Sequence, residues 1–211
     1  MASTRMPLPV RRGTQAVLRI GVAASVLGLA TGCGGSADTK PGADRRPVAA
    51  VESAGQTLSA ATLKPGQPVP PPTQRPVLTL TGRISVTNKG RALQLDRRTL
   101  DRLGVVQVKL YEPWAKKTLD FRGCWLQDLL AVAGVRPGAT RLHITALDDY
   151  QVDLTIADVR RGGILLATMA GDGSTLPIDK GGPTRIVFMN GVKAGANADQ
   201  WIWSLKTVDV E

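Results

Sequence analysis

The sequence of 211 residues is short of the side chains that carry most metal and nucleophile chemistry, with two cysteines and one histidine. The single His143 stands between Leu142 and Ile144, without Cys, Asp or Glu at ligand spacing, which favours a structural residue over a metal ligand. Zinc-ligand spacing, a Ser-His-Asp arrangement and a phosphate-binding P-loop are also missing from the pattern. We therefore predict no catalytic residue and no metal ligand from these motifs.

Aromatic side chains are scarce as well, at 4%, and the longest apolar run falls short of the ~20 residues that span a bilayer as a helix. A polytopic membrane protein is thereby excluded. An apolar fraction of 43% with 21% charged residues is typical of globular proteins, which excludes disorder along the whole chain and a collagen-like structure.

The net charge of +10 is spread unevenly along the chain. Residues 1–32 contribute +4, residues 33–76 contribute +2 and residues 77–211 contribute +4. A basic protein of this size suggests nucleic acid as a partner, but much of the charge lies outside the predicted domain. Together with the export signal described next, this distribution leads us to predict no nucleic-acid partner.

The first 32 residues read as a secretory signal peptide. A basic stretch ends at Arg19 and is followed by an apolar run over residues 20–30. The run ends in Leu-Ala-Thr-Gly before Cys33, which resembles the lipobox of bacterial lipoproteins, although Ala30 stands where that family more often has Leu. The resemblance implies lipidation of Cys33 and an exported cell-envelope lipoprotein facing the outside of the cytoplasmic membrane; the alternative is an ordinary signal peptide whose cysteine is incidental.

Residues 33–76 are rich in Gly, Ala and Pro and contain no aromatic residue. Such a segment buries too little apolar area to offset its ordering entropy. We predict a disordered tether, with its Pro-rich part extended, that holds the domain away from the membrane surface.

Residues 77–211 are long enough for a single core and alternate like strands over most of their length. We expect an α+β fold, a mainly β mixed domain. The expected strands are residues 77–82, 92–95, 105–111, 141–147, 151–156, 164–169, 185–189 and 202–210, and the expected helices are residues 96–103 and 126–133.

Five motifs in this domain resemble, in order, those of the molybdopterin-binding domain of sulfite-oxidase-type enzymes. They are Phe-Arg-Gly at 121–123, Ala-Leu-Asp-Asp-Tyr at 146–150, Leu-Leu-Ala-Thr-Met at 165–169, Gly-Gly-Pro-Thr-Arg at 181–185 and the closing stretch 201–210. The resemblance covers about residues 77–211 and implies the sulfite oxidase fold, with a molybdopterin cofactor.

In that family one cysteine thiolate holds the molybdenum, in a segment where Glu112 and Trp114 match but Leu110 stands at the position of the ligand. Leu cannot coordinate a metal. Cys124, which is the only cysteine of the domain, has three readings: a small buried apolar residue, a thiol of low pKa at a helix N-terminus, or a ligand brought in by a rearranged loop.

The resemblance also places cofactor contacts at Arg185, Lys180, Gly181 and Gly182, besides Glu112 and Trp114. The glycines let the backbone approach a ligand closely, and the cations suit a phosphate. Gln200 replaces a family lysine and removes one contact. The alternative makes residues 181–183 a β-turn and Arg185 a solvated strand residue.

Two further features favour structural interpretations. Asp148 and Asp149 are adjacent in a predicted turn, where carboxylates usually cap backbone amides. Trp201 and Trp203 would share one face of a strand, which favours a core or interface position.

Two functions stay open on these residues: an exported, membrane-anchored oxidoreductase that uses molybdopterin, and a non-catalytic ligand- or protein-binding lipoprotein that retains the fold. The basic excess of the domain is either a solvated face or a surface for anionic lipid headgroups or an anionic ligand. It lies at Arg83, Lys89, Arg91, Arg97, Arg98, Arg102, Lys116, Lys117 and Arg122.

Overall fold

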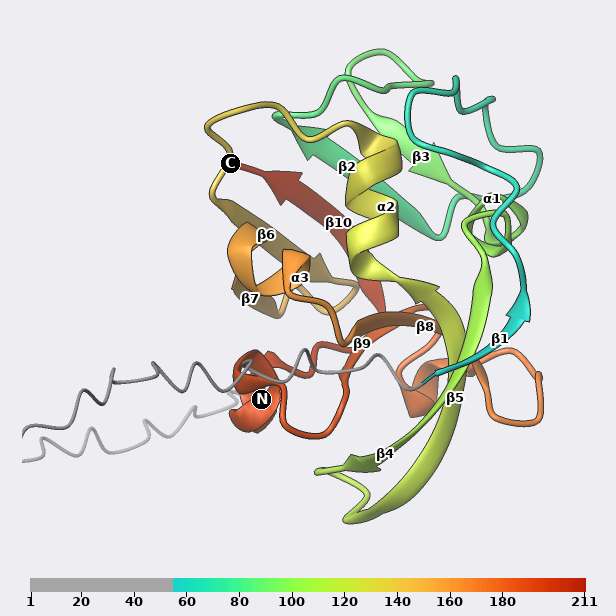
Figure 1. Cartoon of the computed structure of the whole chain (residues 1–211), viewed down its shortest axis with the longest axis vertical. Helices are drawn as coiled ribbons and strands as arrows, with labels where there is room; N and C mark the ends of the chain where they lie inside the picture. Colours follow the sequence, from blue (N-terminus) through green and yellow to red (C-terminus); the bar gives the residue numbers. More distant parts are fainter. Residues whose placement is uncertain (1–54) are drawn as a thin grey trace, which may run out of the picture. The chain divides into compact units, whose positions relative to one another are not determined.

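The computed structural model describes residues 55–211 (Figure 1). The predicted signal peptide, Cys33 and the first part of the predicted tether lie outside the described residues. The strands are β1 (Gln56–Ser59), β2 (Leu78–Gly82), β3 (Leu93–Leu95), β4 (Val105–Glu112), β5 (Lys117–Trp125), β6 (Arg141–Ala146), β7 (Gln151–Thr155), β8 (Ile164–Ala170), β9 (Arg185–Phe188) and β10 (Leu205–Val210). The α-helices are α1 (Arg97–Asp101), α2 (Leu126–Ala133) and α3 (Ile156–Arg160), and the 3₁₀ turns are η1 (Ile178–Lys180), η2 (Lys193–Ala196) and η3 (Ala198–Gln200).

The strands form two five-stranded sheets, in the orders β1-β4-β5-β8-β9 and β3-β2-β10-β6-β7. All neighbours run antiparallel except β2 and β10, which are parallel. Figure 1 shows β4 and β5 as a long curved hairpin. Among the described residues no helix is long and apolar enough to cross a membrane. The α+β, mainly β fold expected from the sequence is confirmed.

The alternating strands bury one face each, as their sequence pattern predicts. In β2 and β6 every second side chain is buried, and these side chains join a single hydrophobic core. Helix α2 buries Leu126, Leu129 and Leu130 and packs against β5 and β8. It ends at Gly134, whose left-handed backbone (φ 64°) suits glycine.

Three local elements differ from the expectation. Strand β5 has no counterpart in the predicted strands, because neither its sequence nor its burial alternates and it is defined by its pairing with β4 and β8. Helix α3 is not among the predicted helices; the side chain of Thr155 caps it by accepting from the amide of Asp158. Strand β10 begins at Leu205 instead of 202, because Ser204 adopts a left-handed backbone (φ 51°).

The prediction that residues 33–76 form a tether is wrong for residues 55–76, which belong to the domain. Strand β1 pairs with β4, and Leu63 and Val69 enter the core with exposed fractions of 2% and 5%. The composition suggested disorder because these residues bury little area among themselves. The surface that covers them comes from the rest of the chain.

Asp96 attaches the Pro-rich part of this segment to the domain. One carboxylate oxygen accepts hydrogen bonds from the amides of Thr73 (2.9 Å) and Gln74 (3.0 Å). The other accepts from the amide (2.8 Å) and hydroxyl (2.7 Å) of Thr99 and so caps α1. Burial alone would raise the pKa of Asp96, but these hydrogen bonds outweigh it and lower the pKa to about 2.

Replacing Asp96 by Asn tests this attachment. Because the folded-state pKa lies below the ordinary value of 3.8, the charged carboxylate stabilises the fold above that pH, and the contribution disappears as the pH falls toward about 2. We expect Asp96→Asn to lower the free energy of unfolding at neutral pH by about 1–2 kcal/mol. Denaturant unfolding at several pH values should show the difference from the wild type shrinking between about pH 4 and pH 2.

The matched control is Asp101→Asn, in the same helix, where the carboxylate is partly exposed and pairs only with Arg97 at 3.1 Å. Its effect should stay below about 1 kcal/mol. Equal losses for the two variants would contradict the special role of Asp96.

Candidate functional site

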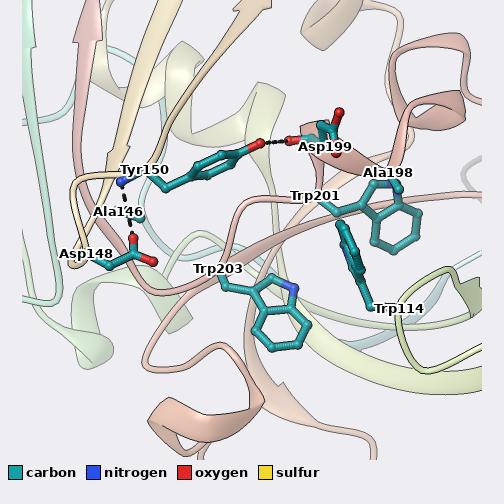
Figure 2. A pocket seen from close by; sticks show the side chains of 8 residues that line it. All are labelled: Trp114, Ala146, Asp148, Tyr150, Ala198, Asp199, Trp201 and Trp203. Carbon is teal, nitrogen blue, oxygen red and sulfur yellow. Dashed lines mark hydrogen bonds between the residues drawn. The ribbon is translucent and has the colours of Figure 1, made fainter. Parts of the chain in front are cut away.

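Two neighbouring cavities open at one end of the domain. The first has a volume of about 420 Å³. It is lined by Trp114, Ala146, Asp148, Tyr150, Ala198, Asp199, Trp201 and Trp203 (Figure 2). The second has a similar volume, about 420 Å³, and extends along the β4–β5 hairpin toward η1. Trp114 and Trp203 line both cavities and therefore lie where the two meet.

A buried ion pair closes one side of the second cavity. Nη2 of Arg185, the first residue of β9, donates to Oε1 of Glu112, the last residue of β4, at 2.7 Å. The exposed side-chain fractions are 4% and 1%. The second oxygen of Glu112 accepts from the amide of Ala115, which sets the turn after β4.

Two aromatic rings hold the guanidinium of Arg185. Its central carbon lies 5.1 Å from the centre of the Phe121 ring and 4.5 Å from that of Trp203. Burial lowers the pKa of Arg185, and the bond to Glu112 opposes that shift. The alternative that Arg185 is a solvated strand residue is therefore wrong.

Four of the six predicted cofactor-contact residues meet at the second cavity. Glu112, Trp114, Lys180 and Arg185 all line it. Gly181 ends η1 with φ 84°, and a Cβ there would come within 2.9 Å of Cγ of Trp203. A Cβ on Gly182 would come within 1.8 Å of the carbonyl oxygen of Leu176, so this glycine allows a close approach of the chain to itself.

The tryptophans near the end of the chain differ from the expectation. Trp201 and Trp203 lie before β10 rather than on it. Trp201 is buried against Phe188, with ring centres 5.5 Å apart, and its Nε1 donates to the carbonyl oxygen of Gly195 at 2.9 Å. Trp203 is half-buried and lines both cavities, and its Nε1 has no partner.

The turn between β6 and β7 supplies the opposite wall of the first cavity. As predicted for a turn, Asp148 caps a backbone amide, that of Tyr150, at 3.2 Å. Asp149 has a left-handed backbone (φ 64°). From the sequence, Asp148 and Asp149 were expected only to cap amides. Tyr150 stands in the motif at 146–150 without a predicted ligand contact, and Asp199 stands in none of the five motifs. Because aromatic residues are scarce in this sequence, Tyr150 and the tryptophans of the cavity could have been recognised as candidates from the sequence.

Leu110 and Cys124 line neither cavity. Leu110 is fully buried and lies opposite Leu119 in the β4–β5 pair. Cys124 lies in β5 with 2% of its surface exposed, and burial, with a smaller contribution from Asp128, raises the pKa of its thiol to about 12. The reading as a thiol of low pKa is thus wrong, and the reading as a small buried residue is confirmed. Within residues 55–211 no group of three His, Cys, Asp or Glu residues is placed to hold a metal.

His143 is half-buried on β6, and its Nδ1 lies 2.8 Å from Oδ1 of Asp153 on the neighbouring strand. It lines none of the cavities described above, in accordance with the structural role expected for it.

Replacing Glu112 by Gln should destabilise the domain strongly, because it leaves the guanidinium of Arg185 buried without a counter-charge. We expect the free energy of unfolding to fall by about 3 kcal/mol or more, measured by denaturant titration. Glu211→Gln is the matched control, because Glu211 pairs with Arg141 at the surface, and its effect should stay below about 1 kcal/mol. A small effect of Glu112→Gln would show that the pair does not hold this end of the domain.

Comparison with known proteins places the chain in a family. Residues 92–211 match the family model of the oxidoreductase molybdopterin binding domain. No curated protein matches the chain. Among solved structures, the sulfane dehydrogenase SoxCD from Paracoccus pantotrophus is similar, with 18% identity and a TM-score of 0.49 over 63% of this chain. The match covers only 37% of the SoxCD chain. Since the family model spans more than half of the sequence, the protein belongs to the oxidoreductase molybdopterin binding domain family.

Proposed function

We propose that this protein is an exported, membrane-anchored member of the family whose domain binds a ligand without the family's molybdenum redox chemistry. The proposal rests on the two positions from which a thiolate ligand could come, because neither offers a thiolate. Leu110 stands at the position that the resemblance gives to the ligand, and the thiol of Cys124 is buried with a pKa of about 12.

A molybdenum centre held by a protein thiolate does not fit these residues. At neutral pH a thiol with a pKa of about 12 stays protonated, and the thiolate is the form that binds metal. Cys124 lies within a strand paired on both sides, so bringing its sulfur to either cavity would require β5 to leave the sheet. We therefore derive no reaction step through a metal.

The arginine expected to contact the pterin is also engaged within the protein. Its charge is neutralised by Glu112 at 2.7 Å, and its guanidinium lies over the rings of Phe121 and Trp203. Nη1 and Nη2 of Arg185 donate to the carbonyl oxygen of Lys180 and to Glu112, and Nε is buried without a hydrogen-bond partner. An anion at this point would compete with Glu112, which favours a structural role for the pair.

The proposed location rests on the leader, which lies outside the described residues. The basic and apolar stretches, the small residues before Cys33 and the domain that follows them have the order expected of a lipoprotein. Two or more acyl chains on one cysteine would anchor the protein stably, at about 0.8 kcal/mol per buried methylene group.

Metal and pterin analysis of the full-length protein tests the proposed chemistry. We expect protein purified from a host that makes the cofactor to contain neither molybdenum nor pterin in stoichiometric amount. A family member that retains the cysteine, expressed in the same host, is the control and should contain both. Stoichiometric molybdenum in the present protein would instead support the molybdopterin-dependent oxidoreductase, and its loss in Cys124→Ser would identify the ligand.

The anchor is tested separately by Cys33→Ala. Because the variant lacks the sulfur that would carry the lipid, we expect the protein to move from the membrane fraction to the soluble fraction, as followed by fractionation and immunoblotting. Cys124→Ala is the control and should stay with the membrane. Continued membrane association of Cys33→Ala would refute lipid anchoring at this residue.

A further inference from the structure

We propose that the first cavity, lined by Trp114, Tyr150, Trp201 and Trp203, binds a small organic cation with an alkylated ammonium group. The inference rests on the proposed function, because it names the ligand class of a domain that binds rather than oxidises.

Aromatic side chains are concentrated at this cavity. The whole sequence has eight, namely four Trp, two Tyr and two Phe. Four of the eight line the first cavity, including three of the four tryptophans. Figure 2 shows the rings of Tyr150, Trp114 and Trp203 grouped around one space. Aromatic faces carry negative electrostatic potential and attract cations, Trp most strongly, so a group of such faces forms a cage for alkylated ammonium ions.

The charged residues that line the first cavity are acidic, although the protein as a whole is basic. Its charged lining residues are Asp148 and Asp199, and no Lys or Arg lines it. The second cavity differs, since it has equal numbers of acidic and basic lining residues: Glu112, Asp120, Asp179, Lys117, Lys180 and Arg185. The first cavity therefore repels an anionic ligand, phosphate included, and attracts a cation.

The buried arginine does not cancel this attraction. Arg185 lies over the Trp203 ring at 4.5 Å, but it lines only the second cavity, and Glu112 neutralises its charge. Two carboxylates alone make a poor site for a bare metal ion, which takes more oxygen ligands. An organic cation satisfies both the carboxylates and the apolar rings.

Hydrogen bonds and packing hold the lining in place without a ligand. The hydroxyl of Tyr150 donates to the carbonyl oxygen of Asp199 at 3.0 Å and so joins the β6–β7 turn to η3 (Figure 2). Trp201 is held by Gly195 and Phe188, and Trp203 by Arg185. A preformed site loses less conformational entropy on binding.

Backbone strain gathers at the same place. Within the described part of the chain, three residues other than glycine have a positive φ: Lys116 (51°), Asp149 (64°) and Ser204 (51°). Each lies within two residues of a side chain that lines the first cavity, namely Trp114, Tyr150 and Trp203. Such conformations are costly and cluster at binding and active sites.

The size limits the ligand. A volume of about 420 Å³ lies toward the lower end of small-molecule sites, for which about 300–1,000 Å³ is usual. A cavity of this size accommodates a cation as small as choline, and choline is the probe of choice. Its neutral isostere, in which a quaternary carbon replaces the nitrogen (dimethylbutanol), has the same shape without the charge.

The experiment is calorimetric titration of the full-length protein, in detergent where needed, with choline and then with its neutral isostere. Intrinsic tryptophan emission serves as a second readout. We expect saturable binding of choline, with a shift in tryptophan emission, and affinity for the isostere at least about tenfold lower. Equal affinity for the two compounds, or no binding of choline, would overturn the proposal.

Variants locate the site. Trp114→Ala should weaken choline binding about tenfold, and its 56% exposure makes loss of folding a minor concern. Tyr111→Ala is the matched control, because Tyr111 is 50% exposed on the same hairpin but lines neither cavity, and it should bind choline as the wild type does. The double variant Asp148→Asn and Asp199→Asn should weaken choline binding but not binding of the isostere. Equal effects of Trp114→Ala and Tyr111→Ala would place the binding elsewhere.

Failure of this inference is distinguishable from failure of the proposed function. Metal and pterin content are measured on the same preparation. If the protein contains no molybdenum and does not bind choline, the cation site is refuted and the proposed function stands. Stoichiometric molybdenum would refute the proposed function.

Discussion

The ion pair between Glu112 and Arg185 joins two strands that are not neighbours in their sheet. Strands β5 and β8 lie between β4 and β9, so the two long side chains meet over the face of the sheet, where Phe121 of β5 packs against the guanidinium. A buried pair of this kind adds little net stability compared with apolar residues of the same volume, but it is costly to break. Its main effect is therefore on position: it fixes the end of β4, the start of β9 and the indole of Trp203.

This use of the arginine supports the proposed function, in which the family fold is retained without the family's molybdenum chemistry. The guanidinium that the resemblance assigns to the cofactor is neutralised from within the protein. Because this charge is cancelled, the acidic and aromatic lining sets the electrostatic character of the first cavity. This holds also where the two cavities meet, at Trp114 and Trp203. The substitution of the thiolate position by Leu110 agrees with the same interpretation.

Asp96 has a comparable role in another part of the domain. A single carboxylate caps α1 and also receives the amides of Thr73 and Gln74, some twenty residues earlier in the chain. This attachment fixes the end of the Pro-rich stretch against the domain. A composition rich in Pro, Gly and Ala predicts disorder only when the rest of the chain offers it no partner, and here the domain offers both hydrogen bonds and the core around Leu63.

Much of the fold was predictable from the sequence because the signals are local. Alternation along β2, β4 and β6 and the helical period of α2 arise from neighbours a few residues apart, and Gly134 marks the end of α2 where predicted. Strand β5 was not predicted because its residues do not alternate, and only its pairing with β4 and β8 makes it a strand.

For the site, the sequence by itself determined the residue types: Leu110 at the position that the resemblance gives to the thiolate, one domain cysteine, Glu112 and Arg185, and few aromatic residues. Only the tertiary structure decided what these residues do. It paired Glu112 with Arg185, buried Cys124 so deeply that its thiol stays protonated, and brought Trp114, Tyr150 and Trp203 together from three separate segments. The physical reason is that pairing, burial and cavity walls depend on contacts between residues far apart in the chain, which no local pattern encodes.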